Sequence, residues 1–157
     1  MEAKKLAAAK FILQRFLATV FADEISEALF RAMKADDFLR NLKAVSHSLY
    51  TKEMAHGAKV LFEFLDGAGV DTHRTLRFEY ADLFLNAGES PVLPYESFYL
   101  DREPTLYGEP VSQMRELLRK QALHKDPGYR EPEDHVAVEF DFLAEMNRRE
   151  AAGDSSV

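Results

Sequence analysis

Apolar residues recur along most of this chain with the three- and four-residue spacing of amphipathic helices. The spacing predicts helices over about residues 3–21, 23–33, 36–49, 52–66, 72–84, 110–122 and 132–150. No stretch of two-residue alternation between turn signals predicts a sheet. We therefore predict an all-α fold, a compact helical bundle of about seven helices that forms one domain over residues 1–157.

Local signals mark several of the helix ends. The expected N-caps are Asp23, Asp36 or Asp37, and Asp71 or Thr72. Gly67 and Gly69 are expected to end the fourth helix. Pro110 and Pro132 suit the first position of a helix, where a missing N–H costs nothing. In the last helix, the residues expected to face inward are Val136, Phe140, Leu143 and Met146, and the terminal Ser-Ser-Val is expected to be frayed.

One long irregular segment, about residues 86–109, interrupts this helical pattern. It begins with the turn-forming run Asn-Ala-Gly-Glu-Ser-Pro at residues 86–91 and contains a second proline at position 94. Loops of this length are uncommon in compact domains and are often functional. The segment is therefore a candidate functional region.

The charge of the chain is concentrated near the same segment. The 157 residues carry a formal net charge of −7, and residues 89–109 and 131–135 contribute −4 and −3 of it. This acidity argues against a nucleic-acid partner, because phosphate binding needs a basic face. It favours a basic ligand or peptide, and the alternative is an acidic surface that keeps the protein in solution.

Composition excludes several further classes of function. The chain has no cysteine, so disulfides, thiolate metal sites and cysteine nucleophiles are excluded. It has no apolar run long enough to span a membrane and no continuous signal-peptide core, so we expect a cytoplasmic protein. The five histidines never pair at helical metal-ligand spacing, and no phosphate-binding loop or nucleophile elbow is present. We therefore expect no metal site, and none of these catalytic patterns is found in the sequence.

The run Glu131-Pro132-Glu133-Asp134-His135 is the first candidate site. Acidic residues beside a helix-starting proline are typical of a well-formed helix N-terminus, which is the simpler interpretation. That interpretation does not account for His135. One turn into the predicted helix, His135 could face the core, bond a backbone carbonyl or point into a groove.

The second candidate is the run of residues 91–99 in the long segment. Two prolines stiffen its entry, and Tyr95, Phe98 and Tyr99 then crowd around Glu96. Aromatic side chains beside a carboxylate suit an arginine or an extended peptide. Alternatively, the segment is a connector whose aromatic residues fill the core. Glu109, at a position like an N-cap before Pro110, is a third candidate.

Four short motifs, taken together and in order, resemble those of the TorD/DmsD family. They are Glu79-Tyr-Ala-Asp-Leu-Phe84, Pro91-Val-Leu-Pro-Tyr-Glu-Ser97 with Tyr99, Gly108-Glu109 and the Glu131–His135 run. The resemblance covers residues 79–143. It implies an all-helical cytoplasmic chaperone, with no enzymatic activity and no cofactor of its own. Such a chaperone binds the twin-arginine signal peptide of a molybdopterin oxidoreductase, the apoprotein or both, until the cofactor of that enzyme is loaded.

By matching position, the resemblance implies peptide-binding roles for Tyr80, Phe84, Pro94, Tyr95, Glu96, Ser97, Tyr99, Glu109, Glu131, Asp134 and His135. The acidic members would pair the two arginines: Glu96, Glu109, Glu131 and Asp134. The aromatic members would line a groove for the apolar part of the leader: Tyr80, Phe84, Tyr95 and Tyr99. His135 would bond a peptide carbonyl or orient Asp134.

The chain departs from the family pattern in two ways. Family members usually continue with further helices after the Glu131–His135 motif, and relatives often place a tryptophan near the aromatic groove, which this chain lacks. Missing helices would expose Phe140, Leu143 and Met146 and favour a homodimer, for which helix exchange is the route known in the family.

Two other functions are kept as alternatives. The first is an assembly chaperone for a non-exported respiratory oxidoreductase subunit of the nitrate-reductase type. The second is a metal-dependent hydrolase that would use Asp134 and His135.

Overall fold

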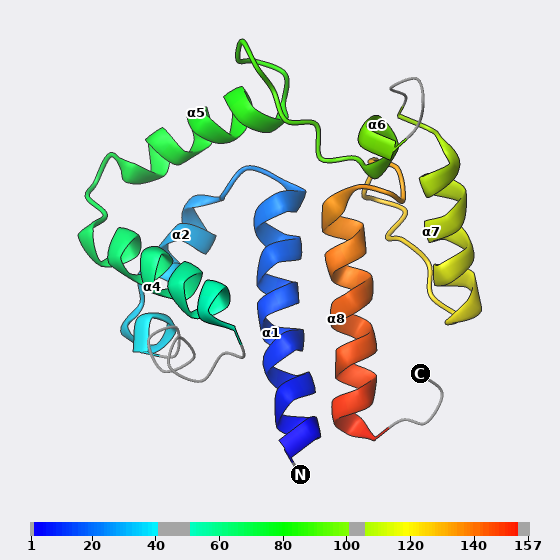
Figure 1. Ribbon diagram of the computed structural model, residues 1–157. Helices are drawn as coiled ribbons and strands as arrows, with labels where there is room; N and C mark the ends of the chain where they lie inside the picture. Colours follow the sequence, from blue (N-terminus) through cyan, green and yellow to red (C-terminus); the bar gives the residue numbers. More distant parts are fainter. Residues whose placement is uncertain (1, 41–50, 101–105, 154–157) are drawn as a thin grey trace. The chain divides into compact units, whose positions relative to one another are not determined.

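The computed structural model describes residues 2–40, 51–100 and 106–153, and within these ranges the regular secondary structure is helical, with no strand. The helices are α1 (Glu2–Ala22), α2 (Glu27–Met33), α4 (Lys52–Gly67), α5 (Thr72–Phe84), α6 (Glu96–Leu100), α7 (Glu109–Lys120) and α8 (Val136–Ala152) (Figure 1). The predicted all-α class is thus confirmed. Residues 36–40 are also helical, but the rest of the helix predicted up to residue 49 lies outside the described residues.

By their contacts the helices form two compact units. Residues 24–81 make one unit, and residues 1–23 with 82–157 make the other. That the chain forms a single domain stays a prediction. None of the described helices is both long and apolar enough to cross a membrane.

The unit of residues 24–81 is held by contacts between its own helices. The Ser26 side chain caps α2 by accepting a hydrogen bond from the Leu29 N–H at 3.1 Å, so the predicted cap at Asp23 is wrong. Asp23 lies too far before the first helical residue to reach the free N–H groups of α2. From α5, the His73 ring lies against Phe30 and its Nε2 is 2.7 Å from the Ile25 carbonyl oxygen. Phe30, Met33 and Leu65 are buried.

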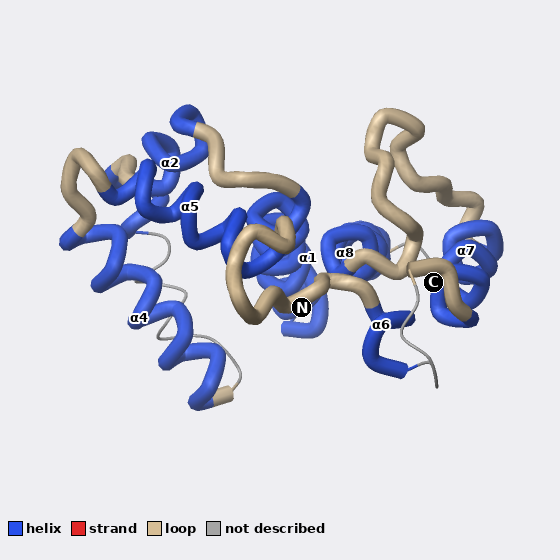
Figure 2. Tube along the Cα trace, turned by 90° about the horizontal axis from the view of Figure 1, so that it is seen from above, coloured by secondary structure: helices blue, strands red, loops and turns tan. Residues whose placement is uncertain are grey.

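In the other unit, α8 lies between α1 and α7, as both Figure 1 and Figure 2 show. The long contact between α1 and α8 includes small buried residues on both helices, which are Ala7 and Ala18 on α1 and Ala144 on α8. Phe21 of α1 stacks on Phe140 of α8 with ring centroids 6.0 Å apart. On the side of α7, Met114 and Leu118 form a buried cluster with Val138, against which Leu123, Tyr129 and Phe142 pack.

This double packing of α8 changes its expected inward face. The helix is covered from two sides, and its buried residues are Ala137, Val138 and Ala144, which lie on a different face of the helix from the one predicted. Leu143, expected to face inward, is instead 43% exposed. The prediction that Leu143 faces inward was wrong, because it assumed that α8 packs against one neighbour through one face.

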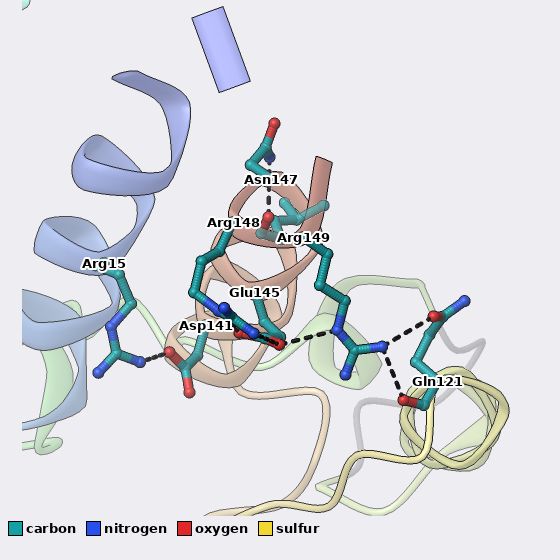
Figure 3. Close-up of polar contacts among 8 residues, drawn as sticks. Arg15, Gln121, Asp141, Glu145, Asn147, Arg148 and Arg149 are labelled. Atoms are coloured by element: carbon teal, nitrogen blue, oxygen red, sulfur yellow. Dashed lines mark hydrogen bonds and ion pairs between the residues drawn. The ribbon is translucent and has the colours of Figure 1, made fainter. Parts of the chain in front are cut away.

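Polar contacts tie α8 to both neighbours (Figure 3). Arg15 of α1 pairs with Asp141, and Arg149 donates a 3.1 Å hydrogen bond to the Gln121 carbonyl oxygen just after α7. Hydrogen bonds from Arg148 and then Arg149 lower the pKa of Glu145 to about 2. Within α8, Glu145 therefore stays charged and aligns Arg149 toward the end of α7.

The segment predicted to be irregular over residues 86–109 contains the short helix α6, so that prediction was too broad. Its first part folds back on the end of α5. The N–H groups of Gly88 and Val92 donate to the carbonyl oxygens of Asp82 and Leu83 at 3.2 and 2.7 Å.

We expect Gly88→Ala to destabilise the protein by about 1–2 kcal/mol, because a side chain there meets backbone. A Cβ at Gly88 would lie 2.7 Å from the Asp82 carbonyl oxygen. The matched control is Gly57→Ala in α4, where a Cβ meets no described atom within 4 Å and where alanine favours the helix. Thermal melts of the two variants check this: an unchanged melting temperature for Gly88→Ala would contradict the close approach.

Candidate functional site

Two segments far apart in the sequence meet at the start of α8. An isolated antiparallel bridge joins Tyr95 to His135. In it, the Val136 N–H donates to the Pro94 carbonyl oxygen at 2.9 Å, and the Glu96 N–H donates to the Asp134 carbonyl oxygen at 3.1 Å. The structure thus brings together two of the sequence motifs, and with them Pro94, Tyr95, Glu96, Ser97, Glu131, Asp134 and His135.

This pairing also moves the start of the last helix. Residues 132–135 form a turn closed by a hydrogen bond from the His135 N–H to the Pro132 carbonyl oxygen. The helix then begins at Val136 with His135 as its N-cap. The predicted start at Pro132 is therefore wrong, and Glu133 and Asp134 lie before the first turn. The bridge to Pro94 and Glu96 uses backbone groups that a longer helix would have needed for itself.

Asp134 is completely buried and holds the short helix α6 in place. Its Oδ2 accepts a 2.8 Å hydrogen bond from the Ser97 N–H and a second from the Ser97 hydroxyl. The Ser97 hydroxyl oxygen in turn accepts a 3.2 Å hydrogen bond from the Gly108 N–H, just before α7. One carboxylate thereby connects the starts of three helices, α6, α7 and α8.

The second oxygen of the same carboxylate is unsatisfied. Asp134 Oδ1 is buried and accepts no hydrogen bond from any of the described residues. A buried acceptor without a donor is costly and is uncommon in folded proteins. The site therefore holds spare acceptor capacity beside α8.

His135 caps α8 with its side chain. Its Nδ1 accepts a 3.1 Å hydrogen bond from the Ala137 N–H, which requires this nitrogen to be unprotonated. The ring lies between Tyr95 and Tyr129, both in edge-on contact at centroid distances of 5.1 and 5.7 Å. Burial lowers the pKa of His135, and the charges of Glu131 and Asp134 oppose that shift. His135 is thus a buried neutral cap, which sequence reasoning did not identify.

Glu131 and Glu133, although close in sequence, have different surroundings. Glu131 accepts a 2.7 Å hydrogen bond from the Tyr95 hydroxyl. Glu133 is held by two hydrogen bonds from Arg115 of α7, at 2.9 and 3.1 Å, and this contact lowers the pKa of Glu133. Glu133 therefore has its cation within the protein, whereas Glu131 contacts a neutral group.

Glu139, one turn into α8, is a part of the site that the sequence did not reveal. Burial, followed by the negative charges of Glu96 and Asp134, raises the pKa of Glu139 to about 7. The only signal in the sequence was its four-residue spacing from His135, which places it on the same face of the helix.

The other predicted site residues have different surroundings. Phe84 packs edge-on against Phe21, at a centroid distance of 5.6 Å. Tyr99 is 58% exposed and contacts Phe98. Glu109 is the first residue of α7, with Gly108 rather than Glu109 at the N-cap, and it accepts a hydrogen bond from Gln113. Tyr80 is buried and belongs to the unit of residues 24–81. Their roles in peptide binding stay predictions.

Within the described ranges, no three His, Asp or Glu side chains gather closely enough to hold a metal ion. Asp134 and His135, the pair considered for a hydrolase, instead bond Ser97 and the Ala137 N–H.

The fold and the site define an all-helical protein in which acidic and aromatic side chains surround the start of its last long helix. The comparisons with known proteins then identify its family. The sequence profile described as nitrate reductase delta subunit matches residues 49–156, so the chain belongs to that family.

Relatives with curated names agree with this assignment and confirm the resemblance to TorD. The chain is 35% identical to Chaperone protein TorD of Vibrio cholerae over 83% of this chain and 59% of that protein. It is 30% identical to the TorD of a Psychrobacter species over 87% of this chain and 61% of that protein. The chain thus spans about three fifths of these relatives. No solved structure matches it.

Proposed function

We propose that this protein is a cytoplasmic chaperone that binds the twin-arginine signal peptide and the apoprotein of a molybdopterin oxidoreductase subunit before export. The observation that supports this most directly is the bridge between residues 94–96 and 134–136, which brings Glu96 and the Tyr95-bonded carboxylate of Glu131 to the start of α8. Such a cluster suits a peptide with adjacent arginines. The relatives named as TorD chaperones point to the same class of function.

In this proposal the site residues divide into two groups. Glu96, Glu109 and Glu131 would contact the arginines, because their carboxylates have no cationic partner among the described residues. Ser97, Asp134 and His135 would be positioning residues, because all three are buried and bond the backbone or one another. Pro94 and Tyr95 would keep the loop against α8.

We expect a twin-arginine leader peptide to bind this protein with an affinity that falls with added salt, because charge pairing contributes to it. Replacing both leader arginines with lysine should weaken binding roughly tenfold, since lysine cannot bridge two carboxylates with a planar fork. Isothermal titration calorimetry with leaders encoded beside the gene measures both effects. The absence of binding to any such leader would contradict the proposal.

The family description favours one second candidate, an assembly chaperone for a non-exported subunit of the nitrate-reductase type. That function predicts binding to the mature N-terminal segment of the client. It also predicts no difference between leaders with Arg-Arg and Lys-Lys. The same calorimetric series therefore separates the two candidates.

A further inference from the structure

Glu139 is a half-buried carboxyl group whose side chain has no hydrogen bond or ion pair with any described residue. It lies in the first turn of α8, where its N–H donates to the His135 carbonyl oxygen at 3.2 Å. The other acidic residues near the start of this helix differ in this respect. Glu133 is paired with Arg115, and Asp141 is paired with Arg15.

Among the described residues, the charged groups that raise the pKa of Glu139 are both negative. Glu96 comes from α6 and Asp134 from the turn before α8. From α1, Arg15 is directed to Asp141, and on the turn itself His135 is neutral because burial lowers its pKa. Glu139 and its two neighbours therefore repel one another, and burial adds to the cost of ionising Glu139.

An independent feature of the same cluster indicates a missing donor. Asp134 is completely buried, and its Oδ1 has no hydrogen-bond donor within the described part of the chain. A cation that carries N–H groups relieves repulsion among carboxylates by bonding the accessible ones, and its positive charge also stabilises the enclosed Asp134 carboxylate without contacting it. Since no metal-binding group forms in the described ranges, an organic cation fits these observations better than a metal ion.

We propose that Glu139, together with Glu96, receives a guanidinium group of the bound peptide and is a specificity-determining residue of the site. This inference rests on the proposed function. A guanidinium presents five N–H donors in a fixed plane and can bond two carboxylates at once. An ammonium group is a point charge and satisfies the same pair less well.

The cluster makes this recognition dependent on pH. Near pH 6 the Glu139 carboxyl is mostly protonated in the free protein, because its pKa is about 7. A guanidinium binds the ionised form, so binding releases the proton to the buffer. Raising the pH to 8 ionises Glu139 beforehand, and binding therefore tightens as the pH rises.

The test compares three proteins by calorimetry with the same twin-arginine leader at pH 6 and pH 8. For the unmodified protein we expect affinity to rise roughly tenfold between these values, as ionisation of a group with a pKa near 7 requires. Glu139→Gln should bind more weakly at pH 8 and lose most of this dependence. Glu150→Gln, at an exposed position of the same helix, should match the unmodified protein.

Further measurements distinguish failure of the inference about Glu139 from failure of the proposed function. Glu96→Gln, at an exposed position, should reduce leader affinity several-fold without affecting folding. Leader binding with an unchanged pH dependence in Glu139→Gln would overturn this inference and leave the proposed function standing. No binding of the leader to the unmodified protein at either pH would overturn the proposed function, and this inference with it.

Discussion

Replacing Asp134 with alanine is expected to destabilise the folded protein by about 3 kcal/mol. The substitution leaves the Ser97 N–H and hydroxyl buried without their acceptor, and it releases α6 from the start of α8. Hydrogen bonds to a charged acceptor are stronger than neutral ones, and their loss at a buried position costs the full desolvation of the remaining partner. Chemical denaturation followed by circular dichroism measures this difference.

A double-mutant cycle with Ser97→Ala tests whether Ser97 carries the effect. In the Ser97→Ala background, Asp134→Ala should lower the free energy of unfolding by clearly less. The Ser97 hydroxyl is then already absent, so only the backbone N–H of residue 97 loses its acceptor. Asp66→Ala, at an exposed position of α4, serves as the control and should stay within about 0.5 kcal/mol of the unmodified protein. Strictly additive effects of Asp134→Ala and Ser97→Ala would contradict an energetic coupling between Ser97 and Asp134.

His135→Ala is expected to cost about 2–3 kcal/mol, since it removes both the N-cap of α8 and a ring that fills the space between Tyr95 and Tyr129. His135→Asn separates these contributions, because asparagine is a good N-cap but lacks the ring. We expect it to recover roughly 1 kcal/mol of the loss. Equal stability of the alanine and asparagine variants would show that the cap contributes nothing.

The same substitution predicts a change in acid stability. Burial lowers the pKa of His135, so the unfolded chain binds a proton more readily than the folded one. The stability contributed by neutral His135 is therefore complete above its ordinary pKa of 6.5 and is lost as the pH falls below that value. Between pH 7 and pH 5, the unmodified protein should lose more stability than His135→Asn, as denaturation midpoints at the two pH values would show.

Glu139 acts on stability in the opposite direction. Its pKa is raised to about 7, so the folded protein becomes less stable as the pH rises from 4.5 through 7. For this reason, the change in stability between pH 7 and pH 5 is compared between the unmodified protein and His135→Asn. Both proteins contain Glu139, so its contribution cancels in that comparison.

The helices themselves were predictable because their causes are local. The apolar spacing in residues 3–21 and 72–84 and the glycines after residue 66 placed α1, α5 and the end of α4 to within about two residues. Where a prediction failed, a contact distant in the sequence had outweighed a local signal. Pro132 is a good first residue for a helix, but pairing of Asp134 and Val136 with residues 94–96 delayed α8 to Val136.

The candidate site was partly predictable for the same reason. The two motifs that meet at α8 were both recognised from the sequence, but their contact was not, because nothing local relates Ser97 to Asp134. The sequence suggested four carboxylates for pairing arginines without distinguishing them. Burial makes the distinction: Asp134 is enclosed and bonded to Ser97, whereas Glu96 and Glu109 are exposed.

The amino-acid sequence by itself determined that this protein is all-helical, acidic around residues 89–109 and 131–135, and similar to a family of chaperones. Those properties depend on residue type and short spacing, which a sequence displays directly. Only the tertiary structure decided that His135 is a neutral cap, that Asp134 connects three helix starts and that Glu139 joins the site. Each of these depends on burial and on distances between remote residues, which arise only when the chain folds.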